Sequence, residues 1–113
     1  MSDGKFTNIS VDELHKLAQN APRLHFLDVR EIDEYQDYHA PGSRNVPLSR
    51  IMEGRAEDDL RMPKDEPVYL ICRSGRRSMT AAELLSQQGF TTLFNVMGGM
   101  EAWKGGGLPL ARF

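Results

Sequence analysis

One stretch, residues 68–89, constrains the fold of this chain more than any other. It reads VYLICRSGRRSMTAAELLSQQG: an apolar run leads to Cys72, a short basic loop follows, and residues 79–88 predict a helix that ends at Gly89. A continuous apolar run of this kind is typical of a strand buried on both faces of a parallel sheet. A strand, a compact loop and a helix N-terminus in that order form a cradle for an anion. The only cysteine of the chain is expected at the floor of that cradle.

The rest of the chain alternates short helices with strands. Ser10 and Glu13 match a capping box at the start of the first helix, and Ile32 and Met79 occupy helix positions that we expect to face the core. The charged segment 53–67 predicts a solvated connection. This alternation predicts a parallel sheet with helices on both faces, which is the α/β class. The predicted helices span residues 11–19, 31–38, 47–52, 79–88 and 100–104, and the predicted strands span residues 25–29, 43–46, 68–71 and 91–96.

Length and composition limit the classes of function. A chain of 113 residues fits one domain, and a formal net charge of -2 gives no general attraction to nucleic acid or to an anionic membrane. One cysteine excludes an internal disulfide and suits a reducing compartment. The first ten residues lack the apolar segment of a secretory signal, and no apolar run approaches the ~20 residues that span a bilayer. We therefore expect a cytoplasmic protein with neither a membrane nor a nucleic-acid partner.

The loop after the strand indicates a reactive cysteine. Arg73, Arg76 and Arg77 follow Cys72 within five residues, and their charges, the loop N–H groups and the helix N-terminus all favour a thiolate over a thiol. Gly75 allows a tight turn without a side chain that would block the pocket. A single cysteine at the end of a strand is usually a small buried hydrophobe, but an inert thiol needs no cationic loop. The alternative that these arginines bind a nucleic-acid phosphate lacks a basic stripe elsewhere in the chain.

The sequence from Cys72 to Ser78, CRSGRRS, resembles the active-site loop of the rhodanese (thiosulfate sulfurtransferase) family. The resemblance extends over roughly residues 9–109 and keeps the order of the family's motifs. It implies a single domain over residues 1–113, with a central parallel sheet of about five strands and helices on both faces. The other matching pieces are DVRE at 28–31, EY at 34–35, HAPG at 39–42, NVP at 45–47, GGMEAW at 98–103 and GLP at 107–109.

This resemblance implies ping-pong sulfur transfer with Cys72 as the catalytic residue. The Cys72 thiolate takes the sulfane sulfur of a small anionic donor such as thiosulfate, and the persulfide so formed passes it to cyanide, a thiol or a carrier protein. No metal and no cofactor are implied. Arg77 is expected to point either to the pocket or back into a structural ion pair. The implied substrate-binding residues are those of the loop: Arg73, Ser74, Gly75, Arg76, Arg77 and Ser78.

Four further residues bear on this interpretation. Asp28 and Arg30 match a family pair near the active site, and we expect them to support the strand ends and the loop by hydrogen bonds rather than to react. His39, in the matching turn, is interpreted as part of the scaffold. Some thiosulfate-using relatives carry a substrate-binding arginine at the position of Glu34. The acidic residue here argues against thiosulfate as the natural donor, and it leaves the persulfide chemistry of Cys72 unaffected because the loop has its own arginines.

Two alternatives belong to other classes of function. A cysteine-dependent phosphatase or arsenate reductase of this general fold needs five residues between its cysteine and its arginine, whereas Arg77 arrives one residue earlier. The shorter loop suits a single sulfur atom better than a tetrahedral phosphate. The second alternative is a persulfide relay, or a binding module of the same fold. Idle modules commonly lose the cysteine, and Cys72 is present with its full basic loop.

Overall fold

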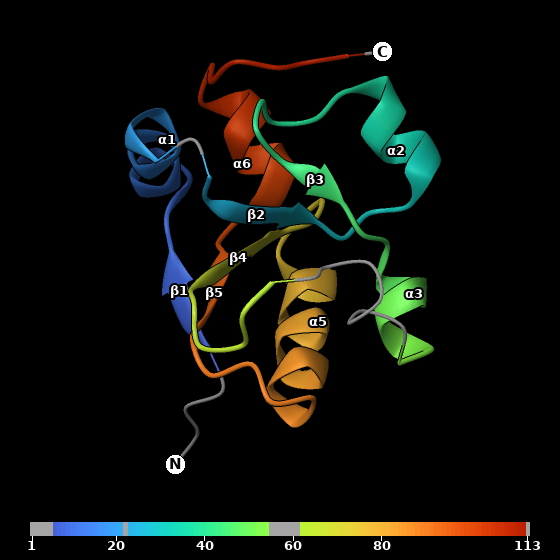
Figure 1. Ribbon diagram of the computed structural model, residues 1–113. Helices are drawn as coiled ribbons and strands as arrows, with labels where there is room; N and C mark the ends of the chain where they lie inside the picture. The colour runs from blue at the N-terminus through green and yellow to red at the C-terminus, as the bar shows by residue number, and fades with distance from the viewer. Residues whose placement is uncertain (1–5, 22, 55–61, 113) are drawn as a thin grey trace.

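The computed structural model describes residues 6–21, 23–54 and 62–112 and confirms the α/β class (Figure 1). Within these residues, five strands form one parallel sheet in the order β1-β5-β4-β2-β3. Residues 55–61 of the predicted charged connection lie outside the described residues. The strands are β1 (Thr7–Ile9), β2 (His25–Asp28), β3 (Arg44–Asn45), β4 (Val68–Ile71) and β5 (Leu93–Val96). The helices are α1 (Val11–Asn20), α2 (Ile32–Asp37), α3 (Leu48–Met52), α5 (Arg76–Gln87) and α6 (Gly99–Gly105).

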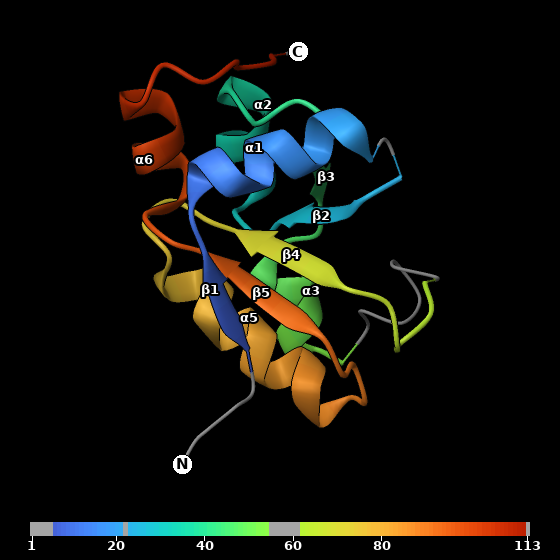
Figure 2. The same cartoon turned by 90° about the vertical axis from the view of Figure 1, so that its left-hand side faces the viewer.

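Helices cover both faces of the sheet. Figure 2 shows α1 and α6 together on one face, and α3 and α5 on the other. The central strand β4 is buried at all four positions because its residues alternate between two cores. Leu70 and Cys72 belong to the core under α3 and α5, whereas Tyr69 and Ile71 belong to the core under α1 and α6. The predicted strand buried on both faces is therefore confirmed, and it carries Cys72 to the C-terminal edge of the sheet.

The helix after the basic loop begins earlier than the sequence predicts. α5 starts at Arg76 rather than at Met79, because Gly75 adopts a φ of +104° and ends the loop there as the N-cap residue. Arg76, Arg77 and Ser78 therefore form the first turn of the helix. A left-handed φ of this kind has almost no steric cost for glycine, so the loop closes in four residues, 72–75.

Three other expectations about elements and faces are wrong. β1 is not among the predicted strands, because it is a three-residue strand of mostly polar sequence at the sheet edge, where β5 supplies its pairing. Ile32 and Met79 were expected to face the core, yet they are 59% and 37% exposed. α2 is a six-residue helix that contains no buried residue, so the apolar spacing that places residues inward in longer helices does not apply there.

The capping box of α1 is confirmed, since Ser10 Oγ accepts the N–H of Glu13 and the Glu13 carboxylate accepts the N–H of Ser10. Within the described parts of the chain, none of the helices has both the length and the apolar character to cross a bilayer.

Candidate active site

Cys72 lies immediately after β4, at the carboxyl edge of the central strand. Ligands of open parallel α/β sheets bind at this edge. The cysteine is a free thiol and only 1% exposed, so almost none of its surface meets solvent. The packing of residue 72 under α5 fixes the sulfur relative to the first turn of that helix.

Two groups contact the sulfur directly. The backbone N–H of Gly75 donates a hydrogen bond to Cys72 Sγ over 3.1 Å, and Ser78 Oγ lies 3.4 Å from the same sulfur. A backbone N–H stabilises negative charge on its acceptor. The loop therefore curls around its own cysteine, as the sequence predicts, and Gly75 serves both as the turn and as a donor.

Ser78 belongs to a buried polar chain that sequence reasoning missed. Its hydroxyl donates to Asn95 Oδ1 on β5, and Asn95 Nδ2 donates to Asn8 Oδ1 on β1 over 3.0 Å. Ser78 and Asn95 are both buried, and buried polar groups are costly unless they are paired. The signal in the sequence is an asparagine in the middle of the apolar strand LFNV, a place where an amide needs a specific partner.

The N-terminus of α6 holds the loop from the other side. The N–H of Met100 donates to the carbonyl of Cys72 over 2.7 Å, and the N–H of Glu101 donates to the carbonyl of Arg73 over 2.9 Å. Gly99 makes this approach possible, because a Cβ there would lie 2.3 Å from the Cys72 carbonyl oxygen, at a φ of +54°. The segment GGMEAW thus supports the loop by backbone contacts.

Asp28 and Arg30 form a buried ion pair at the end of β2. Arg30 Nε and Nη2 donate to the two carboxylate oxygens of Asp28 over 2.9–3.1 Å, and Nη2 also donates to the carbonyl of Tyr38 over 2.6 Å. The pair links the end of the strand to the segment after α2. Both side chains are almost fully buried, so neither is placed to meet a substrate in solvent.

Arg77 makes a bidentate ion pair with Glu34 of α2, over 2.7 and 2.9 Å. The guanidinium hydrogen bonds lower the pKa of Glu34 from 4.5 to about 2, in spite of a partial burial that acts in the opposite direction. The pair answers the question that the sequence left open, because Arg77 is directed to a structural partner 43 residues away. No local pattern in the sequence indicates Glu34 as that partner.

The other loop residues lie at the surface. Arg73 pairs with Glu101 over 3.1 Å, and both side chains are more than half exposed. Ser74 and Arg76 are exposed as well. An exposed ion pair such as Arg73–Glu101 contributes little to stability. The Arg73 side chain can therefore leave Glu101 and reorient at little cost in free energy.

His39 and His25 contact side chains outside the Cys72 loop. His39 is buried and stacks on Tyr35 with ring centroids 3.8 Å apart. His25 contacts Glu66 over 2.7 Å. Among residues 6–21, 23–54 and 62–112, no group of three or more His, Cys, Asp or Glu side chains is arranged to hold a metal ion.

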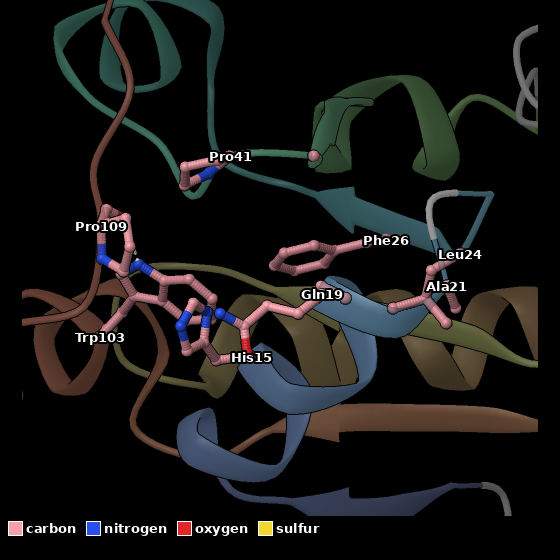
Figure 3. A pocket seen from close by; sticks show the side chains of 10 residues that line it. His15, Gln19, Ala21, Leu24, Phe26, Pro41, Trp103 and Pro109 are labelled. Carbon is pink, nitrogen blue, oxygen red and sulfur yellow. Dashed lines mark hydrogen bonds between the residues drawn. The ribbon is translucent and has the colours of Figure 1, made fainter.

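A hollow of about 390 Å³ opens on the opposite face of the sheet, between α1, β2 and α6 (Figure 3). Its walls are mostly apolar, and its lining contains none of the residues of the Cys72 loop. Phe26 and Trp103, which line it, belong to the core under α1 and α6, whereas Cys72 belongs to the other core. The hollow is therefore separate from the candidate active site. Its lining is His15, Ala18, Gln19, Ala21, Leu24, Phe26, Pro41, Gly42, Trp103 and Pro109.

The fold and this loop together define a class: parallel α/β domains that carry one cysteine at the end of the central strand, followed by a short arginine-containing loop and the N-terminus of a helix. Comparison with known families makes the assignment specific. Residues 10–105 match the rhodanese-like domain family, and the chain belongs to that family.

Relatives and solved structures agree with this assignment. Two proteins of Bacillus subtilis (strain 168) are similar: "Putative sulfur carrier protein YrkF", 39% identical over 86% of this chain and 50% of that protein, and "Putative sulfurtransferase YtwF", 37% identical over 86% of this chain and 89% of that protein. The chain thus spans about half the length of YrkF. The crystal structure of a rhodanese-related protein from Thermoplasma volcanium matches with a TM-score of 0.76 and 30% identity, over 94% of this chain and 98% of that one.

Proposed function

We propose that this protein is a sulfurtransferase that carries sulfane sulfur as a persulfide on Cys72. The observation that carries the proposal is the nearly buried Cys72 sulfur, which accepts the Gly75 N–H at the floor of a loop with three arginines. Membership in the rhodanese-like family supports it, and so do relatives whose names refer to sulfur carriage and sulfur transfer.

The reaction divides into two displacements at sulfur. The Cys72 thiolate attacks the outer sulfur of a donor such as thiosulfate; the donor S–S bond breaks, and its electron pair leaves with sulfite. The new S–S bond makes Cys72 a persulfide that bears the negative charge. An acceptor such as cyanide or a thiolate then attacks the terminal sulfur, and the electron pair of the Cys72 S–S bond restores the thiolate. Two easier transfers thus replace one difficult transfer.

The loop contributes mainly by electrostatics. The Gly75 N–H, and the other loop amides as the donor enters, stabilise negative sulfur in the way that an oxyanion hole stabilises oxygen. Arg73 and Arg76, both exposed, are the candidates for attracting the anionic donor. Ser78 lies close enough to the sulfur to orient it. Asp28 and Arg30 hold the strand end from behind and take no direct part in our scheme.

The acceptor in our proposal is a thiol, small or carried by a protein. A relative named as a sulfur carrier supports a protein partner, and a persulfide relay uses the same Cys72 chemistry. A cysteine that must remain reduced suits the cytoplasm, which we propose as the location.

Intact-mass spectrometry tests the covalent intermediate. After incubation with thiosulfate or an organic hydropersulfide, the wild-type chain should gain one sulfur atom, and cyanide should remove it as thiocyanate. The Cys72→Ser variant, which changes one atom of the side chain, should gain none. A wild-type mass that stays unchanged with both donors contradicts the proposal. Turnover of p-nitrophenyl phosphate by the same sample would favour a phosphatase instead.

A further inference from the structure

The three arginines of the loop differ in how their charge is compensated. Arg77 is held by Glu34 in a half-buried bidentate pair. Arg73 meets Glu101 in an exposed pair with a single hydrogen bond. Within the described residues, no carboxylate forms an ion pair with Arg76, whose side chain is exposed. Among the residues that the structure describes, Arg76 is therefore the loop arginine whose charge is not paired with a carboxylate.

Glu34 and Cys72 both interact electrostatically with Arg77. Hydrogen bonding to Glu34 is the main cause that raises the pKa of Arg77, and the charges of Cys72 and Asp28 raise it further. Arg77 is thus near enough to sense charge on the sulfur. Once Cys72 is a thiolate, that charge and the carboxylates of Glu34 and Glu101 balance the three arginines. A dianion approaching this site meets little net attraction.

Three large apolar side chains are exposed on the segments that follow β2, β4 and β5. They are Ile32 at 59%, Met79 at 37% and Met97 at 47%. Ile32 begins α2 just after β2, Met97 follows the end of β5, and Met79 is the fourth residue of α5, which follows β4 and the loop. β2 and β5 are the two neighbours of β4 in a parallel sheet, so these three residues leave the same edge that carries Cys72. This surface offers contact to a carbon-containing group and nothing to an inorganic dianion.

We propose that the sulfur donor is an organic hydropersulfide, R–S–S⁻, and that Glu34 is the residue that selects it over dianionic thiosulfate. This inference rests on the function proposed above. The Cys72 thiolate attacks the terminal sulfur of the donor, the donor S–S bond breaks, and its electron pair leaves with R–S⁻. The donor carries one negative charge rather than two, so the nearby thiolate and carboxylates repel it less than they repel thiosulfate, and its R group can contact the exposed side chains of Ile32, Met79 and Met97.

Coulomb's law makes the proposal quantitative. Removing one negative charge from the site changes the interaction energy of a dianion by twice as much as that of a monoanion in the same place. The logarithm of the rate enhancement caused by the substitution should therefore be twice as large for a dianionic donor as for a monoanionic one. If Glu34→Gln raises kcat/KM for a monoanionic hydropersulfide about three-fold, it should raise kcat/KM for thiosulfate about ten-fold. Glu34 acts here through Arg77 and through the field, not by contact with the donor.

The experiment compares donors across matched variants of the full chain. Rates of persulfide formation on Cys72 are measured with thiosulfate and with benzyl hydropersulfide, for wild type, Glu34→Gln and Glu101→Gln. Glu83→Gln is the control, because it makes the same change in charge on an exposed position of α5, about 9 Å along the helix from Arg77. We expect the larger gain for thiosulfate in Glu34→Gln, a smaller one in Glu101→Gln, and rates within about 1.5-fold of wild type in Glu83→Gln, since solvent screens an exposed charge at that distance.

The dependence of the rates on ionic strength distinguishes an electrostatic role of Glu34 from a purely structural one. The gain in thiosulfate use should decline as ionic strength rises, because the added attraction is electrostatic. Persulfidated serum albumin is the third donor and separates the two sources of R–S–S⁻. Transfer from it at a rate near that of benzyl hydropersulfide supports a donor carried by a protein, and transfer from the small compound alone supports a metabolite; either result supports the donor class.

Two different failures are distinguishable. If wild-type Cys72 gains sulfur from none of the three donors, the proposed function falls, and this inference falls with it. If Cys72 gains sulfur but Glu34→Gln changes both small-donor rates by the same factor, only the inference is overturned. Circular dichroism and thermal unfolding of each variant identify a loss of fold. Because Glu101 is an exposed residue, Glu101→Gln still tests the charge argument if Glu34→Gln does not fold.

Discussion

Asp28 and Arg30 form a buried ion pair at the end of β2, on the edge of the sheet that carries Cys72. Their side chains are 0% and 3% exposed, and Arg30 satisfies both carboxylate oxygens as well as the carbonyl of Tyr38. An ion pair of this kind contributes little relative to a well-packed apolar pair, but it is costly to break on one side.

Arg30→Met should therefore destabilise the fold by about 3–5 kcal/mol, because it leaves a buried carboxylate without a countercharge. The double variant Asp28→Asn/Arg30→Met should recover part of that loss, since the amide carries no charge. Urea unfolding of the wild type and both variants measures the difference. A loss below about 1 kcal/mol in the single variant would mean that the carboxylate is hydrated or protonated at little cost.

At this scale the sequence predicted the residues of the loop but not their partners. Cys72, Gly75 and the arginines stand together in the chain, so their proximity could be predicted from the spacing alone. The partner of Arg77 is Glu34, on a different helix. That pairing depends on how α2 and α5 meet across the sheet edge, which no local pattern in the sequence encodes.

Among the elements, α6 shows most clearly how a short helix can determine a loop. Its first amides bind the carbonyls of Cys72 and Arg73. Gly99 is the residue that lets the two backbones approach, because a Cβ there would lie within 2.3–2.6 Å of both carbonyl oxygens. Contacts of this kind between backbones cannot be relieved by a change of rotamer.

Gly99→Ala should therefore lower the free energy of unfolding by about 2–4 kcal/mol and slow the alkylation of Cys72 by iodoacetamide, since the loop must shift. Gly105→Ala is the matched control, because it lies in the same helix and its Cβ would meet nothing within 4 Å. It should leave the alkylation rate unchanged and raise stability by up to about 1 kcal/mol. Equal effects of the two substitutions would contradict the role assigned to Gly99.

Predictions of elements from the sequence succeeded where apolar runs were long and failed at their ends. β4 was predicted with its correct bounds because a run of four apolar residues is typical of a strand that is buried on both faces. α5 was predicted to begin three residues too late, because RRS is typical of a loop and the sequence does not show that Gly75 adopts a positive φ. β1 carries no apolar alternation, and only its pairing with β5 makes it a strand.

On the scale of the whole molecule, the parallel order β1-β5-β4-β2-β3 brings separate segments to one edge. Cys72 follows β4, Arg30 and α2 follow β2, and Met97 and α6 follow β5. The alternation of elements predicted the α/β class, the family resemblance implied a sheet of about five strands, and the structure confirms both. The Glu34–Arg77 pair joins α2 and α5 at this edge. Breaking the pair should therefore lower the free energy of unfolding of the domain.

Acid is the simplest way to break the pair. The pKa of Glu34 is lowered from 4.5 to about 2 in the folded chain, so the folded state binds a proton less readily than the unfolded state does. The stabilisation is therefore complete above pH 4.5 and declines as the pH falls toward 2. Because the pair is partly exposed and screened by solvent, we expect it to contribute about 1–2 kcal/mol at neutral pH.

Urea unfolding at pH 7, 4.5 and 3 should show this contribution as a difference between wild type and Glu34→Gln. The glutamine variant cannot lose a charge at position 34, so the gap of about 1–2 kcal/mol at pH 7 should narrow steadily below pH 4.5 and approach zero near pH 2. Glu83→Gln, which removes an exposed carboxylate from α5, should follow the wild type throughout. A gap that stays constant from pH 7 to pH 3 would show that Glu34 stabilises the fold through packing or helix capping, and the same result would weaken the electrostatic basis of donor selection.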